Sequence, residues 1–168
     1  MLKASAEAMP ALPGRGGTEA VLYALDGDWE KADAAMAALE AEAETVYTEA
    51  KKSVDGIRDG SHPQFFVREV DEAALDAFWA WFAECEGEIA ACLAKESYGE
   101  AFAMVQPKLR ELFPFMERDL DLAFQPVEAG IKVIFADYYA LALREGYEKL
   151  LARRPDSLEN PWIFAIER

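Results

Sequence analysis

Three carboxylates stand two residues apart in the second half of the chain, at Glu117, Asp119 and Asp121. Alternate residues of a strand share one face, so these side chains would lie at the distances that an acid/base pair or a hard cation requires. The same alternation is typical of a solvated strand face, or of a contact surface for a basic partner. We therefore keep Asp119 and Asp121 as candidate binding residues and assign no catalytic residue.

A third candidate, Asp137, ends an apolar segment and is followed by Tyr138 and Tyr139. A carboxylate at the end of a strand either lines a pocket or caps the helix that follows. We predict that Asp137 caps the following helix, and keep a pocket as the alternative.

Other chemistry finds no support in the residue types. The segment DGDWEKAD resembles the start of a calcium loop, but Lys31 replaces the required glycine and Ala37 the required glutamate. His62 is the single histidine, and two cysteines do not complete a zinc site. Cys85 and Cys92 would lie about 10.5 Å apart along one helix, too far for a disulfide. We predict no metal and no cofactor.

The charge of the chain restricts its partners. The chain has 32 acidic and 17 basic residues, which gives a net charge of -15. Nucleic acids and anionic membranes would be repelled, whereas a basic protein would be attracted. The sequence has no apolar run of the ~20 residues that a membrane helix needs, and its first residues lack a secretory pattern. We expect a cytoplasmic protein.

The elements that must position these residues begin with helices. Residues 1–17 are rich in Gly and Pro and predict a flexible arm. A short helix over residues 18–25 and a long helix from Asp28 to Val54 then predict a helical hairpin over residues 18–60.

Apolar residues of the long helix recur every three or four positions, as in a coiled-coil seam. They are Trp29, Ala32, Met36, Leu39, Ala43, Val46 and Ala50. The seam packs against a neighbouring helix of the same domain, or forms a homodimer around Trp29, Met36 and Ala43.

The rest of the chain, residues 64–168, reads as an α+β core. Residues 64–70 predict a strand, and Asp71 caps a helix to about Lys95. One stripe of that helix faces the core, namely Leu75, Phe78, Trp79, Phe82, Ile89 and Leu93, with Trp81, Cys85 and Cys92 at its flank. A helix with a kink or restart at Pro107 follows.

The C-terminal part predicts a ββαβ order. The strands are residues 117–124, 131–139 and 162–167, with a helix over residues 140–154. We thus expect one α+β domain over residues 1–168, in which a helical N-terminal half packs with a small, mostly antiparallel sheet.

Residues 78–168 resemble a loosely defined group of small bacterial α+β proteins of unknown function. The resemblance lies in Phe78, Trp79, Trp81 and Phe82 on a helix, and in Pro155 before the strand that starts at Trp162-Ile163-Phe164. It implies a bacterial source and a fold, but no activity.

The leading hypothesis for function is a non-enzymatic binding or accessory protein with an acidic surface. Alternatives are an enzyme or small-molecule binder with a pocket near Asp119, Asp121 and Asp137, and a structural oligomer through the N-terminal helix. A pocket would require at least two of the three carboxylates to converge in one cleft.

Overall fold

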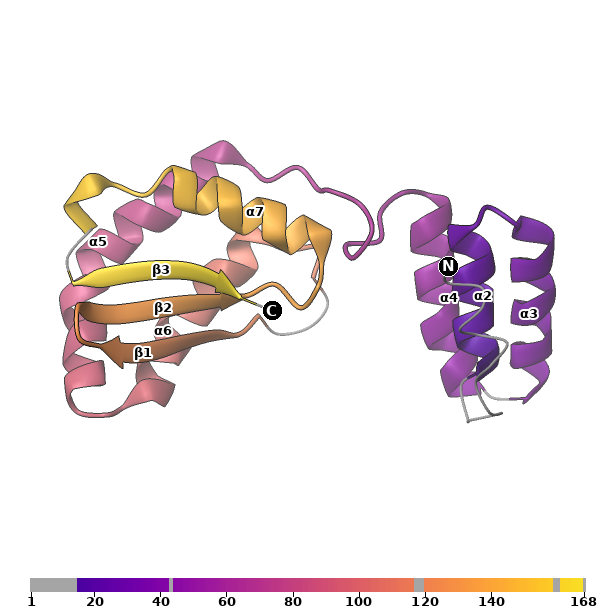
Figure 1. The fold of residues 1–168 in the computed structure, drawn as a ribbon, viewed down its shortest axis with the longest axis horizontal. Coiled ribbons are helices and arrows are strands. Elements are labelled where there is room, and N and C mark those ends of the chain that lie inside the picture. Colours follow the sequence, from indigo (N-terminus) through magenta and orange to yellow (C-terminus); the bar gives the residue numbers. More distant parts are fainter. Residues whose placement is uncertain (1–14, 43, 117–119, 159–160, 168) are drawn as a thin grey trace. The chain divides into compact units, whose positions relative to one another are not determined.

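The computed structural model describes residues 15–42, 44–116, 120–158 and 161–167. It is an α+β structure with a mixed sheet in its C-terminal part (Figure 1). Where the sequence predicts one domain, the chain divides into two compact units, Met1–His62 and Pro63–Arg168.

The first unit contains three helices within its described residues: α2 (Arg15–Leu25), α3 (Trp29–Glu42) and α4 (Glu44–Arg58). Residues 15–17 of the predicted arm belong to α2, so the arm prediction is wrong for them. Residues 1–14 lie outside the described residues. The predicted hairpin of two helices is also wrong, because the long second helix is divided into α3 and α4.

Contacts of Arg58 show that α4 folds back along α3. Its guanidinium carbon lies 5.0 Å from the centre of the Trp29 ring, and its Nη2 lies 2.6 Å from Asp33 Oδ1. In one continuous helix, residues 29 and 58 would be about 43 Å apart. Folding back lets both segments bury their apolar positions within a three-helix unit, which one long helix does not allow.

The apolar seam is used inside this unit. Ala32, Met36, Leu39 and Ala50 are buried, and α2 contacts both α3 and α4. A Cβ atom added at Gly16 would lie 2.9 Å from Leu39 Cδ2, so α2 and α3 approach closely because Gly16 has no side chain. Packing within the domain thus accounts for the buried seam residues. Ala43 lies outside the described residues, and the homodimer stays a prediction.

The second unit begins with an irregular segment. Residues 64–70 form no strand, so that prediction is wrong. A strand is stable only beside another strand. Here the backbone instead forms hydrogen bonds with the start of a helix. The carbonyl oxygens of Pro63 and Gln64 accept hydrogen bonds from the nitrogens of Ala142 and Leu141, at 2.9 and 3.4 Å. These bonds satisfy N–H groups at the start of α7 (Leu141–Ala152).

Two long helices follow, α5 (Glu72–Ala94) and α6 (Tyr98–Leu112). Asp71 caps α5 as predicted, because its side chain accepts a hydrogen bond from Ala73 N at 3.0 Å. Pro107 lies inside α6, which continues through it as one helix.

The sheet has the order β1-β2-β3. β1 (Leu122–Val127) and β2 (Gly130–Ala136) form the predicted antiparallel hairpin, joined by a two-residue turn. The predicted bounds are wrong, because Pro126 and Val127 belong to β1 and residues 137–139 leave the strand. β3 (Trp162–Glu167) pairs with β2 in parallel. The sheet is therefore mixed and not mostly antiparallel as predicted. After β2 the chain runs back through α7 and the short 3-10 helix η1 (Asp156–Leu158), so that β3 has the same direction as β2.

The aromatic run of α5 forms the core against the sheet. All six residues of the predicted stripe are buried. Phe82 meets Trp162 at 5.2 Å and Trp79 meets Phe164 at 5.0 Å between ring centres. The indole of Trp79 also donates a hydrogen bond to Leu150 O at 2.7 Å. This bond fixes α5 against α7 and satisfies a polar group that would otherwise be buried at a cost.

The flank of the stripe is half-buried, as expected for Trp81, Cys85 and Cys92. Both cysteines carry thiols without a disulfide. Among the described helices, none combines the length and the hydrophobicity that crossing a bilayer demands.

Candidate functional site

Two of the three candidate carboxylates lie at the same end of the sheet. Asp121 directly precedes β1 and Asp137 directly follows β2. The antiparallel register pairs Leu122 with Phe135, and Ala136 N donates a hydrogen bond to Asp121 O at 3.2 Å. Asp119 lies outside the described residues, so the structure gives no position for it.

Asp137 is the only buried charged residue in the described part of the chain, with 2% of its surface exposed. One carboxylate oxygen accepts a hydrogen bond from Tyr139 N, and the other from Arg144 Nη1, both at 2.9 Å. The N-cap of α7 is Ala140, which makes no side-chain cap bond. The prediction that Asp137 caps this helix is thus wrong, and the carboxylate instead fixes the preceding turn and holds Arg144.

Asp121 is exposed, and it forms two hydrogen bonds with the hydroxyl of Tyr138. The Tyr138 hydroxyl donates to Asp121 Oδ2 at 2.5 Å and accepts from Asp121 N at 3.0 Å. The turn that carries this tyrosine is unusual, because Tyr138 and Tyr139 have φ angles of 49° and 61°. Side chains other than glycine rarely adopt this left-handed conformation. The contacts of Asp137 and Asp121 hold the turn in place.

A buried phenol lies close to this group. Tyr147 packs between Phe113 and Phe135, with ring centres 4.9 and 5.0 Å away. Burial raises the pKa of Tyr147, and the charges of Tyr138, Asp137 and Asp121 raise it further. Its hydroxyl has no hydrogen-bond partner among the described atoms. This phenol therefore stays protonated near neutral pH and is unsuited to act as a base.

The carboxylates at the sheet end are therefore occupied by structural contacts. Asp137 neutralises Arg144, and Asp121 binds a hydroxyl from the neighbouring turn. No three histidine, cysteine or acidic side chains gather into a metal-binding group within the part of the chain that the structure describes.

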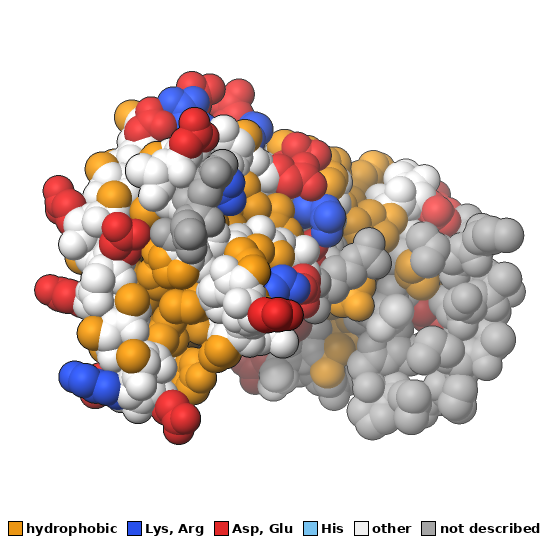
Figure 2. Space-filling model, turned by 60° about the vertical axis from the view of Figure 1, so that its left-hand side comes forward, with side chains coloured by type: hydrophobic (Ala, Val, Ile, Leu, Met, Phe, Trp, Pro, Cys, Tyr) orange, Lys and Arg blue, Asp and Glu red, His pale blue; other side chains and the backbone are white. Residues whose placement is uncertain are grey.

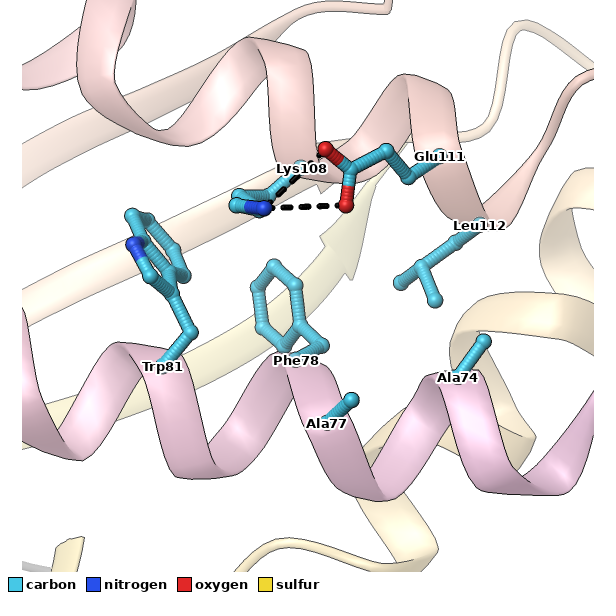
Figure 3. Close-up of a pocket in the computed structure, with 7 residues that line it drawn as sticks. All are labelled: Ala74, Ala77, Phe78, Trp81, Lys108, Glu111 and Leu112. Atoms are coloured by element: carbon cyan, nitrogen blue, oxygen red, sulfur yellow. Dashed lines mark hydrogen bonds and ion pairs between the residues drawn. The ribbon is translucent and has the colours of Figure 1, made fainter.

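A second candidate site lies between α5 and α6, where a groove encloses a cavity of about 100 Å³. Its lining comes from Ala74, Ala77, Phe78 and Trp81 of α5 and from Lys108, Glu111 and Leu112 of α6 (Figure 3). The Lys108 ammonium lies 3.0 Å from each carboxylate oxygen of Glu111 and forms the polar side of the groove.

Aromatic side chains make the apolar part of this groove rigid. The rings of Phe78 and Trp81 are 5.7 Å apart, and the buried Phe78 also packs on Trp79 and Phe82 of the core. Trp81 is half-buried, so one part of its indole faces the groove and another part packs on Phe82, 6.3 Å away. The shape of the groove is therefore supported by the core.

Acidic side chains lie along the same side of α5 and α6. At 100° per residue, Glu88 follows Trp81 after seven positions and lies within about 20° of it around the helix. The thiol of Cys92 lies 3.8 Å from Glu100 Oε2, so the end of α5 meets the start of α6. Carboxylates thus occur at both ends of the α5–α6 surface, with Glu111 at one end and Glu88 and Glu100 toward the other.

An apolar area also occurs on the face of the molecule drawn in Figure 2. On the face shown in Figure 2, hydrophobic side chains gather in a continuous area, and acidic side chains are distributed around it. Exposed apolar areas of this kind commonly mark interaction sites.

Sequence reasoning placed Trp81 at the edge of the core and missed the groove. Lys108 and Glu111 are three residues apart, a spacing typical of ordinary surface pairs on helices. Their relation to Trp81 depends on how α5 packs on α6, about 27 to 30 positions away in the sequence.

Comparison with known proteins adds no relative. No family model, no curated protein and no solved structure matches the chain.

Proposed function

We propose that the chain is a non-enzymatic protein-binding module that receives a basic partner protein. The observation that carries the proposal is the α5–α6 groove, whose apolar, aromatic floor is bordered by the Lys108–Glu111 ion pair. The exposed carboxylates of Glu88 and Glu100 lie farther along the same two helices. Protein interfaces typically have such an apolar centre with a polar rim.

The charge of the chain supports a basic partner. A net charge of -15 would accelerate the approach of a cationic protein and repel nucleic acids. The rate of association should therefore fall as salt rises, because ions screen the attraction between exposed charges.

An enzyme with a carboxylate-lined pocket is less well supported. Both described candidates, Asp121 and Asp137, accept hydrogen bonds from neighbouring groups of the fold. A general acid or base needs access to a substrate proton, and Asp137 is buried against Arg144.

The experiment is a pull-down with the tagged protein from a lysate of the source organism, washed at low and then at high salt. We expect mass spectrometry to find one basic protein in stoichiometric amount, released as salt rises. An unrelated protein of similar negative charge serves as the control for nonspecific attraction. The retained protein is then purified and bound again to the tagged chain. If nothing binds specifically, the proposal is wrong, and a small-molecule site or self-assembly through the N-terminal helix becomes the better hypothesis.

A further inference from the structure

We infer that the α5–α6 groove binds a basic amphipathic helix of its partner, with one aliphatic side chain in the cavity and a Lys or Arg three turns away. This inference rests on the proposed function and names the part of the partner that is recognised.

The size of the cavity selects the anchor. Its volume of about 100 Å³ is smaller than the ~150 Å³ of an apolar cavity that holds benzene. A single aliphatic side chain therefore fits it better than an aromatic ring. The contact with Ala74, Ala77 and Leu112 would remove apolar surface from water on both partners, which is the main favourable term in such binding.

The groove favours a helical partner over an extended one. Its walls are two α-helices, whose backbone groups are hydrogen-bonded within each helix. An added strand needs a free sheet edge for its own backbone, which this surface lacks. A partner helix can instead place its side chains between those of α5 and α6.

The carboxylates set the spacing of the partner's charges. Glu88 lies eleven residues beyond Ala77, about 16.5 Å along the helix axis and within about 20° of it around the helix. A partner helix aligned with α5 has the same rise, so a Lys or Arg eleven residues from the aliphatic anchor would reach Glu88. Glu100, near Cys92, adds a second negative charge at that end.

Synthetic peptides of about 18 residues, long enough for a helix, test this inference on the purified full chain. The first peptide carries Leu on one helical face and Lys on the other. The second has the same composition in scrambled order, without an apolar face. Fluorescence anisotropy measures both affinities, and we expect the amphipathic peptide to bind about tenfold more tightly or better. Equal affinities would show attraction by charge alone and would overturn the inference.

Two pairs of variants locate the site. Ala77→Met fills the groove from an exposed position and should weaken the amphipathic peptide about tenfold. Its control, Ala83→Met, is exposed on the opposite face of α5 and should change affinity less than about twofold. Glu88→Gln should weaken binding about twofold to threefold and reduce its salt dependence. Its control, Glu128→Gln in the exposed β1–β2 turn, should do neither.

The outcomes separate this inference from the proposed function. If the pull-down retains a basic partner but Ala77→Met and Ala83→Met bind that partner equally, the groove is not the site and only this inference fails. If no partner is retained at all, the proposed function itself fails.

Discussion

The buried carboxylate of Asp137 and the guanidinium of Arg144 form an ion pair 2.9 Å long that joins the end of β2 to α7. Arg144→Ala would leave Asp137 buried with only the Tyr139 N–H as a described partner. Removing one partner of a buried ion pair lowers the free energy of unfolding, because the other charge stays buried without compensation. The loss is smaller here because the Arg144 side chain is half-exposed. We expect urea denaturation to show a loss of about 2 kcal/mol in the free energy of unfolding.

A double mutant tests the physical reason for that loss. Adding Asp137→Asn to Arg144→Ala removes the unpaired charge, so it should recover part of the lost stability. Lys149→Ala, on an exposed position of the same helix, serves as the control and should have little effect. If Arg144→Ala is as stable as this control, the pair does not stabilise the fold.

The hydroxyl of Tyr147 is buried without a described partner, so Tyr147→Phe should leave stability unchanged or raise it by up to about 1 kcal/mol. Tyr138→Phe is the matched comparison, because it removes the hydroxyl that bonds both Asp121 N and Asp121 Oδ2. That variant should lose about 1 kcal/mol. Thermal unfolding followed by circular dichroism measures both, and the reverse order would contradict the assignment of the two hydroxyls.

Two helical glycines should respond to alanine in opposite ways. A Cβ at Gly146 would lie 2.4 Å from Phe113 Cε1, whose ring is buried against Tyr147. Gly146→Ala should therefore cost about 1–3 kcal/mol through overpacking. A Cβ at Gly87 meets nothing within 4 Å, so Gly87→Ala should stabilise α5 by about 0.5–1 kcal/mol. Chemical denaturation would contradict the described packing if both variants changed stability in the same direction.

Stability at acid pH should depend on the contact between Asp76 of α5 and Arg153 after α7. Two hydrogen bonds of 2.6 Å join the two side chains, and the bonding from Arg153 lowers the pKa of Asp76 from its ordinary value of 3.8. A lowered folded-state pKa stabilises the protein above the unfolded pKa, and this stabilisation is lost as pH falls through the folded pKa.

The test compares wild type with Arg153→Gln. At pH 7 the variant should unfold at lower urea concentration, and the difference should shrink below pH 3.8 as Asp76 becomes protonated. The effect should be small and salt-sensitive, because both side chains are exposed. A difference that stays constant down to about pH 2 would show that the charge of Asp76 is not its cause.

Local patterns were sufficient to predict α5 and the β1–β2 hairpin. The helix was recognisable from Asp71 as its cap and from the 3.6-residue period of its buried stripe. The hairpin was recognisable from alternation and from Gly130, whose φ of 141° suits glycine. Both elements depend on residues that are near each other in the sequence.

The errors concern contacts between distant residues. The seam from Trp29 to Ala50 has the same period in one long helix and in the antiparallel pair α3 and α4, so periodicity does not show where the chain reverses. Residues 64–70 have the composition of a strand, but none of the strands in the described part of the chain pairs with them. The parallel pairing of β3 follows from the path through α7, which strand alternation does not contain.

The candidate site also combines features that the local sequence predicts with features that depend on contacts between distant residues. The sequence by itself determined the charge, the core-facing aromatics of α5 and the position of Asp137 at the end of a strand. Only the tertiary structure decided that Asp137 is paired with Arg144 and that Trp81 shares a groove with Lys108 and Glu111. The physical reason is that backbone geometry imposes its period on neighbouring residues, whereas the pairing of side chains far apart in the sequence depends on how the helices and strands pack.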